Sequence, residues 1–345
     1  MSTTLVVRLD SDGDVLLAGP AVRAVAASGD RVVLLVGPQG AAAARLLPGV
    51  DEVLVWSCPW IVADPAPVDP GDIAEVVDQL RARRVDRALV LTSFHQSPLP
   101  TALVLRLAGV AWVGAVSEDY PGSLLDLRLR LPDAGLHEAQ RQLRLAEAAG
   151  FALPPGDDGG LAVRRPLPDV GGLVGDEPYL VVHPGASVPA RAPGVPWATD
   201  LVAALAERGR RVLVTGGPGE TALTAAVAGT SAAIDLGGAT TLAQLAAVLD
   251  GADAVVVGNT GPAHLAAAVG TPVVSLFAPV VPAERWRPWR VPHALLGDQE
   301  APCALSRAKT CPVPGHPCLD DVPVEHVLAA VQALAPAPRR LEPIP

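Results

Sequence analysis

The chain has 345 residues, of which 50% are hydrophobic, and its formal net charge at pH 7 is −10. The length suits two domains better than one, and the charge disfavours nucleic acid or an anionic lipid surface as the main partner, because both bind clustered cations. No apolar run is long enough to span a membrane, and the first residues lack a signal-peptide pattern. Four cysteines in so long a chain do not predict a disulfide scaffold. We therefore expect a cytoplasmic protein of two domains.

The first domain is expected over residues 1–153, where predicted strands alternate with predicted helices. The strands are expected at 4–9, 31–36, within 46–56, at 87–91 and at 112–115, and the helices at 15–27, 72–84 and 99–108. This alternation with short loops predicts an α/β fold with a doubly wound parallel sheet. Residues 154–177 are rich in Pro, Gly and Asp and are expected to form a linker.

The second domain, over residues 178–334, repeats the alternation. Its strands are expected at 179–182, 211–215, 233–235, 254–257 and 272–277, and its helices at 199–208, from 220, at 242–249, 262–269 and 324–334. Residues 335–345 are expected to be disordered. Two Rossmann-like domains facing one another would form a cleft, and ligands of such sheets bind at the carboxyl ends of the strands.

The turn after the strand at 254–257 has the composition of an anion site. Thr260 is a suitable N-cap for the helix at 262–269, Gly261 permits a ligand to approach the backbone, and His264 lies one turn further on. The positive end of the helix dipole would then face a phosphate. A plain crossover with a capped helix explains the turn alone equally well.

Two more loops follow strands in the second domain. In the first, His183 to Ser187, the backbone and the Ser187 hydroxyl could bind phosphate oxygens, with Arg191 near enough to neutralise charge. In the second, Gly217 permits close approach of a nucleoside and Glu220 could accept bonds from ribose hydroxyls. A strand-exit turn and a glutamate at a helix start are the alternatives.

Three carboxylates follow the first strand. Asp10, Asp12 and Asp14 do not form a calcium loop, because Val15 stands where that loop needs Gly and Ala21 where it needs Glu. A carboxylate here could accept a proton from an acceptor hydroxyl. Asp14 could equally be a helix N-cap.

The C-terminal region holds Cys303, Cys311 and Cys318 with His316 nearby. Zinc sites usually contain a C-x-x-C pair, which is missing here, so packing or a redox-labile contact is favoured over a bound metal.

Taken together, five segments resemble glycosyltransferase family 9, the ADP-heptose heptosyltransferases, in the order RLDSDGDVLLAGPAVRAV, PGVDEVLVW, VVHPGAS, LVTGGPGE and GNTGPAHLAAAVGTPVVSLFAP. The resemblance implies a GT-B fold and inverting, metal-independent transfer of a heptose or related sugar from a nucleotide diphosphate, ADP first, to an acceptor hydroxyl. It also implies a small-molecule acceptor, no cofactor, no nucleic-acid partner, no transmembrane segment and a monomer.

The resemblance also assigns roles to residues. Asp14 looks like the general base. Apart from the resemblance, we expect the acceptor at Asp12, Trp60 and His95, where Trp60 is a candidate sugar platform and buried packing is its alternative. The donor is expected at Ser187, Arg191, Gly217, Glu220, Asn259, Thr260, Gly261 and His264.

The chain departs from the family pattern at two of these positions. Arg191 is followed by Ala-Pro-Gly-Val-Pro-Trp, whereas the family places Lys or Arg shortly before Trp-Pro, and Asn259 stands where the family has an acid, which predicts a changed donor preference. The acidic composition suits a soluble acceptor, such as a natural product, better than lipopolysaccharide. A nucleotide-sugar 2-epimerase and a non-catalytic sugar-nucleotide-binding protein are the alternatives.

Overall fold

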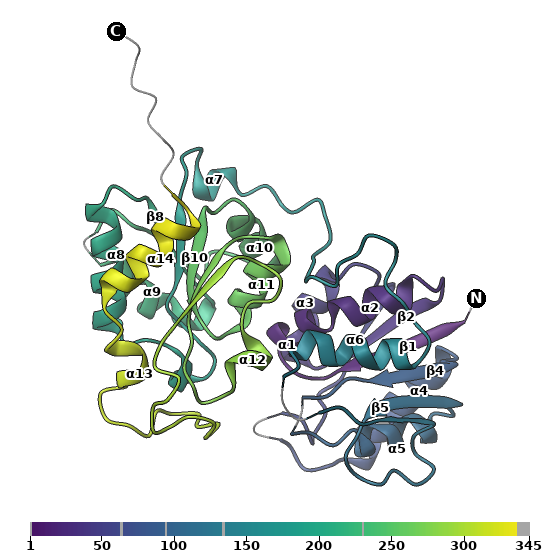
Figure 1. Cartoon of the computed structure of the whole chain (residues 1–345). Helices are drawn as coiled ribbons and strands as arrows, with labels where there is room; N and C mark the ends of the chain where they lie inside the picture. Colours follow the sequence, from purple (N-terminus) through teal and green to yellow (C-terminus); the bar gives the residue numbers. More distant parts are fainter. Residues whose placement is uncertain (1, 63–64, 94, 133–134, 230, 337–345) are drawn as a thin grey trace. The chain divides into compact units, whose positions relative to one another are not determined.

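The structure is a computed structural model that describes residues 2–62, 65–93, 95–132, 135–229 and 231–336 (Figure 1). The chain divides between Pro166 and Leu167 into two compact units, called unit 1 and unit 2 here. All but the first two residues of the tail predicted to be disordered, 335–345, lie outside the described residues. The described residues of each unit form a six-stranded sheet whose neighbouring strands are all parallel, which confirms the predicted α/β class.

The sheet of unit 1 has the strand order β3-β2-β1-β4-β5-β6. Its strands are β1 (Thr3–Arg8), β2 (Arg31–Val36), β3 (Glu52–Val55), β4 (Arg87–Val90), β5 (Trp112–Val116) and β6 (Leu127–Leu129), and its helices are α1 (Asp12–Leu17), α2 (Gly19–Ala26), η1 (Pro38–Gly40), α3 (Ala41–Leu46), α4 (Pro70–Ala82), α5 (Leu99–Leu107) and α6 (Glu138–Ala148). Strands β1 and β2 are buried on both faces, as their unbroken Val and Leu runs predict. Helices α4 and α5 contribute to the core on one face of the sheet, and α2 packs against α6 on the other (Figure 1).

Several helical features of unit 1 differ from the prediction, among them the unpredicted η1 and α3. The helix expected at 15–27 is two helices, because Pro20 cannot donate a backbone bond and a new helix starts around it. The first of them begins at Asp12, so Asp12 and Asp14 lie in a helical turn. Helix α6 was not predicted from the sequence at all.

The sheet of unit 2 has the strand order β12-β11-β10-β7-β8-β9. Its strands are β7 (Leu180–His183), β8 (Val212–Gly216), β9 (Ile234–Gly237), β10 (Ala254–Gly258), β11 (Val273–Leu276) and β12 (His293–Leu296), and its helices are α7 (Gly171–Val174), η2 (Pro189–Arg191), α8 (Val195–Glu207), η3 (Pro218–Glu220), α9 (Thr221–Ala228), α10 (Leu242–Asp250), α11 (Gly261–Val269), α12 (Ala283–Trp286), α13 (Pro317–Asp320) and α14 (Val324–Leu334). Strand β12, in a stretch with no predicted strand, pairs with β11 and forms one edge of the sheet.

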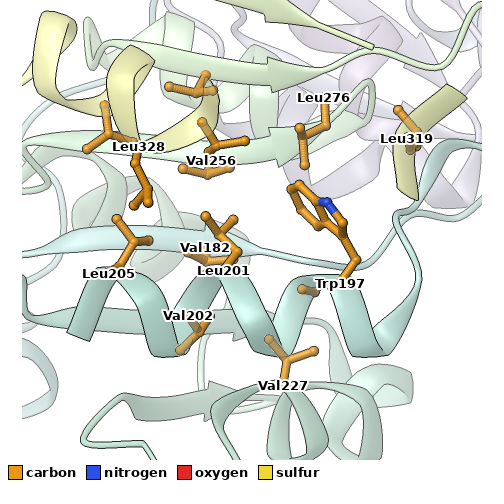
Figure 2. Close-up of a cluster of buried hydrophobic side chains, with 14 of the residues drawn as sticks. Val182, Trp197, Leu201, Val202, Leu205, Val227, Val256, Leu276, Leu319 and Leu328 are labelled. Atoms are coloured by element: carbon orange, nitrogen blue, oxygen red, sulfur yellow. The ribbon is translucent and has the colours of Figure 1, made fainter. Parts of the chain in front are cut away.

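The core of unit 2 lies between its sheet and helices α8 and α14. Trp197, Leu201 and Leu205 project from α8 toward Val256 of β10 and Leu328 of α14 (Figure 2). Each of these side chains is less than a tenth exposed. Burying a side chain of this size contributes about 1.5–3 kcal/mol, so this apolar face of α8 fixes the helix on the sheet.

Part of the segment predicted as a linker belongs to unit 1. The guanidinium of Arg23 binds both carboxylate oxygens of Asp157, at 2.6 and 2.9 Å, and also the carbonyl of Gly160. Further along, the backbone N–H of Arg164 donates to the carbonyl of Leu46 at 2.7 Å. The chain is therefore attached to unit 1 well beyond residue 153.

Each sheet has one place where the chain reverses the direction in which strands are added. In unit 1 this switch point lies between the adjacent strands β1 and β4, and in unit 2 between the adjacent strands β7 and β10. Ligands of doubly wound sheets bind beyond the carboxyl ends of the strands at such points. The fold thus singles out two places, the loops after β1 and β4 and the loops after β7 and β10.

Candidate functional site

At the switch point of unit 2, strand β7 ends in a buried histidine. His183 is 6% exposed, and its Nδ1 lies 3.0 Å from the hydroxyl oxygen of Thr215 on β8. Burial lowers the pKa of His183 to about 4, although the nearby Glu220 carboxylate acts in the opposite direction. The imidazole is therefore neutral at pH 7 and joins the ends of β7 and β8 as an uncharged group.

The carboxylate of Glu220 is held beside this histidine by two glycines. Its Oε2 accepts a bond of 2.7 Å from the backbone N–H of Gly217 and lies 3.9 Å from Nε2 of His183. A Cβ added at Gly185 would lie 2.0 Å from its Oε1, so only glycine leaves room for the carboxylate there. The side chain is 27% exposed, which leaves it open to ribose hydroxyls.

The loop that carries Ser187 and Arg191 lies against the end of β10. A Cβ added at Gly258 would lie 2.4 Å from the carbonyl oxygen of Arg191, so glycine permits this close approach. Ser187 is exposed and Arg191 is half-buried. The loop is also bonded to the C-terminal region, because the backbone N–H of Ala190 donates to the carbonyl of Lys309 at 3.0 Å.

The turn after β10 starts helix α11 differently from the prediction. Thr260 occupies the N-cap position, but its side chain makes no capping bond, so the expected hydroxyl cap is wrong. The helix begins at Gly261 with Pro262 in its first turn, and no acidic residue offsets the positive end of its dipole. His264 is buried one turn further on.

Asn259 has a structural role that sequence reasoning missed. The side chain is 5% exposed, and its amide donates to the carbonyl of Ala278 at 3.3 Å and accepts from the N–H of Ala278 at 3.2 Å. The amide thereby connects the end of β10 to the chain just after β11. Its predicted part in donor choice stays a prediction.

Replacing Asn259 with aspartate should destabilise the protein by about 1–3 kcal/mol, because a carboxylate oxygen would face the carbonyl of Ala278 without a hydrogen between them. Denaturant unfolding measures the loss. The matched control is Gln299→Glu, in which an exposed amide that donates to the carbonyl of Phe277 loses its donor. The control should lose less than about 1 kcal/mol, since the exposed carboxylate stays hydrated. Equal losses would contradict the role given to Asn259.

The switch point of unit 1 is occupied by a buried arginine. The guanidinium of Arg8 is fully buried, and its Nε lies 3.1 Å from Asp10 while its Nη2 lies 2.9 Å from Oδ1 of Asp14. The hydroxyl of Ser11 donates to the other oxygen of Asp14, Oδ2, at 2.9 Å. Asp14, with 24% of its side chain exposed, is thus held by both of its oxygens and still reaches solvent.

Asp10 lies deeper than Asp14. Burial raises its pKa, while Arg8 acts to lower it. The side-chain amide of Gln96 also donates to its Oδ1 at 2.6 Å. Asp10 is therefore part of the support for Arg8.

Two of the three predicted acceptor residues contact other protein groups. Oδ1 of Asp12 accepts from the backbone N–H of Ala43 at 2.9 Å, which fixes the start of α3 against α1, and burial raises the pKa of Asp12. The indole N–H of Trp60 donates to the hydroxyl of Thr101 at 3.0 Å, and its ring packs edge-on against Trp56. These contacts give both residues structural roles.

The third predicted acceptor residue, His95, lines a pocket of about 200 Å³ in unit 1. The pocket lies beyond the carboxyl ends of β4 and β5, and its wall includes Ser93, Gln96, Ser117 and Arg141. Sequence reasoning missed these four. Ser117 could have been found, because it lies two residues after the strand predicted at 112–115, whereas Arg141 lies on the unpredicted α6.

The pocket adjoins the Asp14 carboxylate. Nη2 of Arg8 lies 2.9 Å from the hydroxyl oxygen of Ser93 in the pocket wall and 2.9 Å from Oδ1 of Asp14. One nitrogen therefore joins the wall to the carboxylate.

The cysteines are in the two cores. Cys58 is buried in unit 1, Cys303 and Cys318 are buried in unit 2, and Cys311 packs against the same core. Burial raises the pKa of Cys58 and of Cys318 to about 12. Among the residues that the structure describes, no group of three or more His, Cys, Asp or Glu side chains is placed to hold a metal ion. Within the same ranges, no helix is both long and apolar enough to cross a membrane.

Comparison with known proteins gives consistent results for sequence and structure. Residues 73–316 match the model of the family described as glycosyltransferase family 9 (heptosyltransferase). Lipopolysaccharide heptosyltransferase 3 of Escherichia coli K12 is 30% identical over 226 residues, which cover 59% of this chain and 61% of that protein. A second Escherichia coli protein of that name is 31% identical over 183 residues, 51% of each chain. The matched segment thus spans less than two thirds of either relative.

Solved structures resemble nearly the whole chain. A glycosyltransferase of family 9 from Veillonella parvula DSM 2008 has a TM-score of 0.79 at 16% identity, covering 97% of both chains. The Escherichia coli ADP-heptose lipopolysaccharide heptosyltransferase II has a TM-score of 0.74 at 20% identity, covering 97% of this chain and 98% of its own. These likenesses confirm the predicted GT-B fold. Because the family model also matches well over half of the chain, from α4 to the cysteine-containing segment, the protein belongs to glycosyltransferase family 9.

Proposed function

We propose that the protein is an inverting glycosyltransferase that moves a sugar, a heptose or a related one, from a nucleotide diphosphate to an acceptor hydroxyl. ADP is the proposed nucleotide. The observation that carries the proposal is the Glu220 carboxylate, which Gly217 holds and Gly185 accommodates beside the unit 2 switch point. Family membership supports the same chemistry.

The donor would bind to unit 2 at the ends of β10, β7 and β8, which are neighbours in the sheet. Glu220 accepts bonds from the ribose hydroxyls, as the acid of a dinucleotide fold does. Ser187 and Arg191 contact the diphosphate, and the start of α11 at Thr260 and Gly261 stabilises its negative charge through the helix dipole. That charge grows as the sugar leaves, so these groups favour the transition state over the bound donor.

The acceptor would react next to unit 1. Its hydroxyl oxygen attacks the anomeric carbon from the face opposite the diphosphate, the bond from that carbon to the diphosphate breaks, and the configuration inverts. The proton of the hydroxyl passes to Asp14. The contacts from Arg8 and Ser11 hold this carboxylate in one orientation, so it is prepared for the transfer.

The direct test is release of ADP from ADP-heptose, measured with and without hydroxyl acceptors and followed by analysis of the glycoside formed. Binding is checked separately by thermal shift, since ADP at a hundred times its dissociation constant adds about 2.7 kcal/mol of stability. Stabilisation by ADP and acceptor-dependent release are expected. Conversion of the nucleotide sugar without any acceptor would instead indicate an isomerase, and ADP binding without any turnover a non-catalytic binding protein.

Replacing Glu220 with glutamine should weaken the binding of ADP while hardly changing the affinity for inorganic pyrophosphate. Glutamine can still accept from Gly217, but it loses the charge that strengthens bonds to ribose, so a loss of about tenfold is expected. Calorimetric titration of both ligands measures it. The control is Glu207→Gln at the exposed end of α8, which should change neither affinity. An equal loss for ADP and pyrophosphate would remove the ribose role.

We also propose that the transfer is independent of metal, because the start of α11 can stabilise the departing diphosphate. Incubation with a chelator should leave both the rate of ADP release and the melting temperature unchanged. A stoichiometric metal signal in the purified protein, lost together with activity on chelation, would refute this.

A further inference from the structure

The pocket of unit 1 has the size of a single ring. Its volume of about 200 Å³ is below the roughly 300–1,000 Å³ of pockets that bury drug-sized ligands. It lies at the carboxyl ends of β4 and β5, next to the switch point of its sheet. Arg8 connects Ser93 in its wall to Asp14.

Most residues of the wall carry polar side chains, although apolar atoms still form a large share of its surface. Hydroxyls come from Thr92, Ser93, Ser97 and Ser117, and apolar atoms come mainly from Pro98 and Val116. Ser93 and Ser117 are only 5% and 3% exposed, so these hydroxyls are fixed parts of the wall. Buried hydroxyls at fixed positions suit a ligand rich in hydroxyl groups, since every such group needs a partner once water is displaced.

Two acids lie at the exposed end of the pocket, and the guanidinium of Arg128 donates to the carbonyls of Ser117 and Glu118 beside them. Glu118 and Asp119 are exposed and belong to the wall, and the hydroxyl of Ser97 donates to Asp119 at 3.0 Å. The cation of the wall, Arg141, is 7% exposed and lies 3.7 Å from the buried Glu138. Its charge is therefore balanced within unit 1. A phosphorylated acceptor would be repelled at this end of the pocket, and an amino group would be attracted.

An aromatic side chain follows these two acids. Tyr120 comes directly after Asp119 and is 84% exposed. An exposed aromatic face next to carboxylates is suited both to the C–H face of a ring and to an ammonium group.

We propose that this pocket binds the acceptor as a single hydroxyl-rich ring that carries an amino group, such as an amino sugar or aminocyclitol. Glu118 and Asp119 select the ammonium, and the serine hydroxyls hold the ring with one of its hydroxyls toward Asp14. The inference rests on the proposed glycosyl transfer and names the acceptor class for it.

The test uses three probes on the full-length protein: glucosamine, glucose and glucose 6-phosphate. Saturation-transfer NMR should rank glucosamine first, about tenfold tighter than glucose, because a charged hydrogen bond replaces a neutral one. Glucose 6-phosphate should not displace glucosamine from the pocket. With ADP-heptose present, glucosamine should accelerate ADP release more than glucose does.

Two variants locate the binding. Asp119→Asn alters an exposed side chain and should reduce the affinity for glucosamine to that for glucose, while glucose itself is unaffected. Ser117→Leu should fill the pocket and abolish binding of both sugars, and its melting curve shows whether the fold is kept. Asp78→Asn, an exposed acid on α4 with 73% of its side chain accessible, is the control and should change nothing.

Any one of four results would overturn the inference. These are equal affinity for glucosamine and glucose, competition by glucose 6-phosphate, no binding of any probe at millimolar concentration, and binding that Asp119→Asn does not alter. Thermal shift with ADP on the same samples separates failure of the acceptor inference from failure of the proposed function. If ADP stabilises the protein and the sugars do not bind, the acceptor inference alone fails. If glucosamine binds and ADP does not, the proposed donor chemistry fails.

Discussion

Replacing Asp14 with asparagine should lower the rate of sugar transfer by about 10²–10⁴ without changing the affinity for ADP. That range is usual for the loss of a general base. Asparagine can still accept from Arg8 and meet the hydroxyl of Ser11, so the local structure should persist, but its amide cannot take the proton of the acceptor. Single-turnover measurement of glycoside formation gives the rate, and titration with ADP gives the affinity.

The matched control is Asp12→Asn, two residues earlier on α1. Its oxygen accepts from the backbone N–H of Ala43, and an asparagine oxygen can do the same, so little loss of activity is expected. If Asp12→Asn proves the more damaging change, the base is misassigned. If Asp14→Asn also loses stability or ADP binding, its effect on the rate comes from the fold.

Most strands of both sheets could be predicted because their sequences are largely apolar runs, whereas the short edge strands β6 and β12 were not predicted. Residues 31–36 form a strand at the predicted bounds, and the strand expected at 254–257 extends by one residue to Gly258. Buried parallel strands need such runs on both faces, so the pattern is strong. Helix α6 lacks an equivalent signal, since it is mostly polar and its N-cap is His137, which accepts from the N–H of Ala139.

The candidate site could be predicted only where a residue lies in the loop that follows a predicted strand. Asp14 and Glu220 satisfy that condition, and the structure holds both by specific contacts. The sequence could not distinguish the role of Asp12 from that of Asp14. The backbone N–H that binds Asp12 belongs to Ala43, which lies far along the chain on α3.

The pocket of unit 1 was beyond prediction for a related reason. Its wall combines residues 92–93, 95–98, 116–119 and 141, which meet only because β4 and β5 are adjacent and α6 reaches their ends. Strand order is set by packing across the whole sheet and is not encoded in any local pattern. The role of Asn259 could not be predicted either, because its partner Ala278 lies beyond the next strand of the chain.

Replacing Arg8 with methionine should destabilise the protein by about 3 kcal/mol at pH 7, the lower end of the cost of removing one partner from a buried ion pair. Arg8 is fully buried, and its loss leaves the carboxylates of Asp10 and Asp14 close together with 14% and 24% exposure. The control is Arg31→Met on the neighbouring strand β2. Arg31 is 42% exposed and pairs with Glu52, so it should cost less than about 1 kcal/mol.

The pH dependence of this loss distinguishes lost charge from lost packing. In the native protein burial raises the pKa of Asp10, while Arg8 acts to lower it. Without Arg8, the pKa of Asp10 in the folded protein rises further above its value in the unfolded chain. Protonated Asp10 therefore stabilises the folded variant below the unfolded pKa, and this contribution is lost as the pH rises through the folded pKa. The difference between wild type and Arg8→Met should therefore be largest near pH 7 and shrink as the pH falls toward 4. Urea unfolding at several pH values measures it. A difference that does not change with pH would mean that Arg8 acts through packing rather than through its charge.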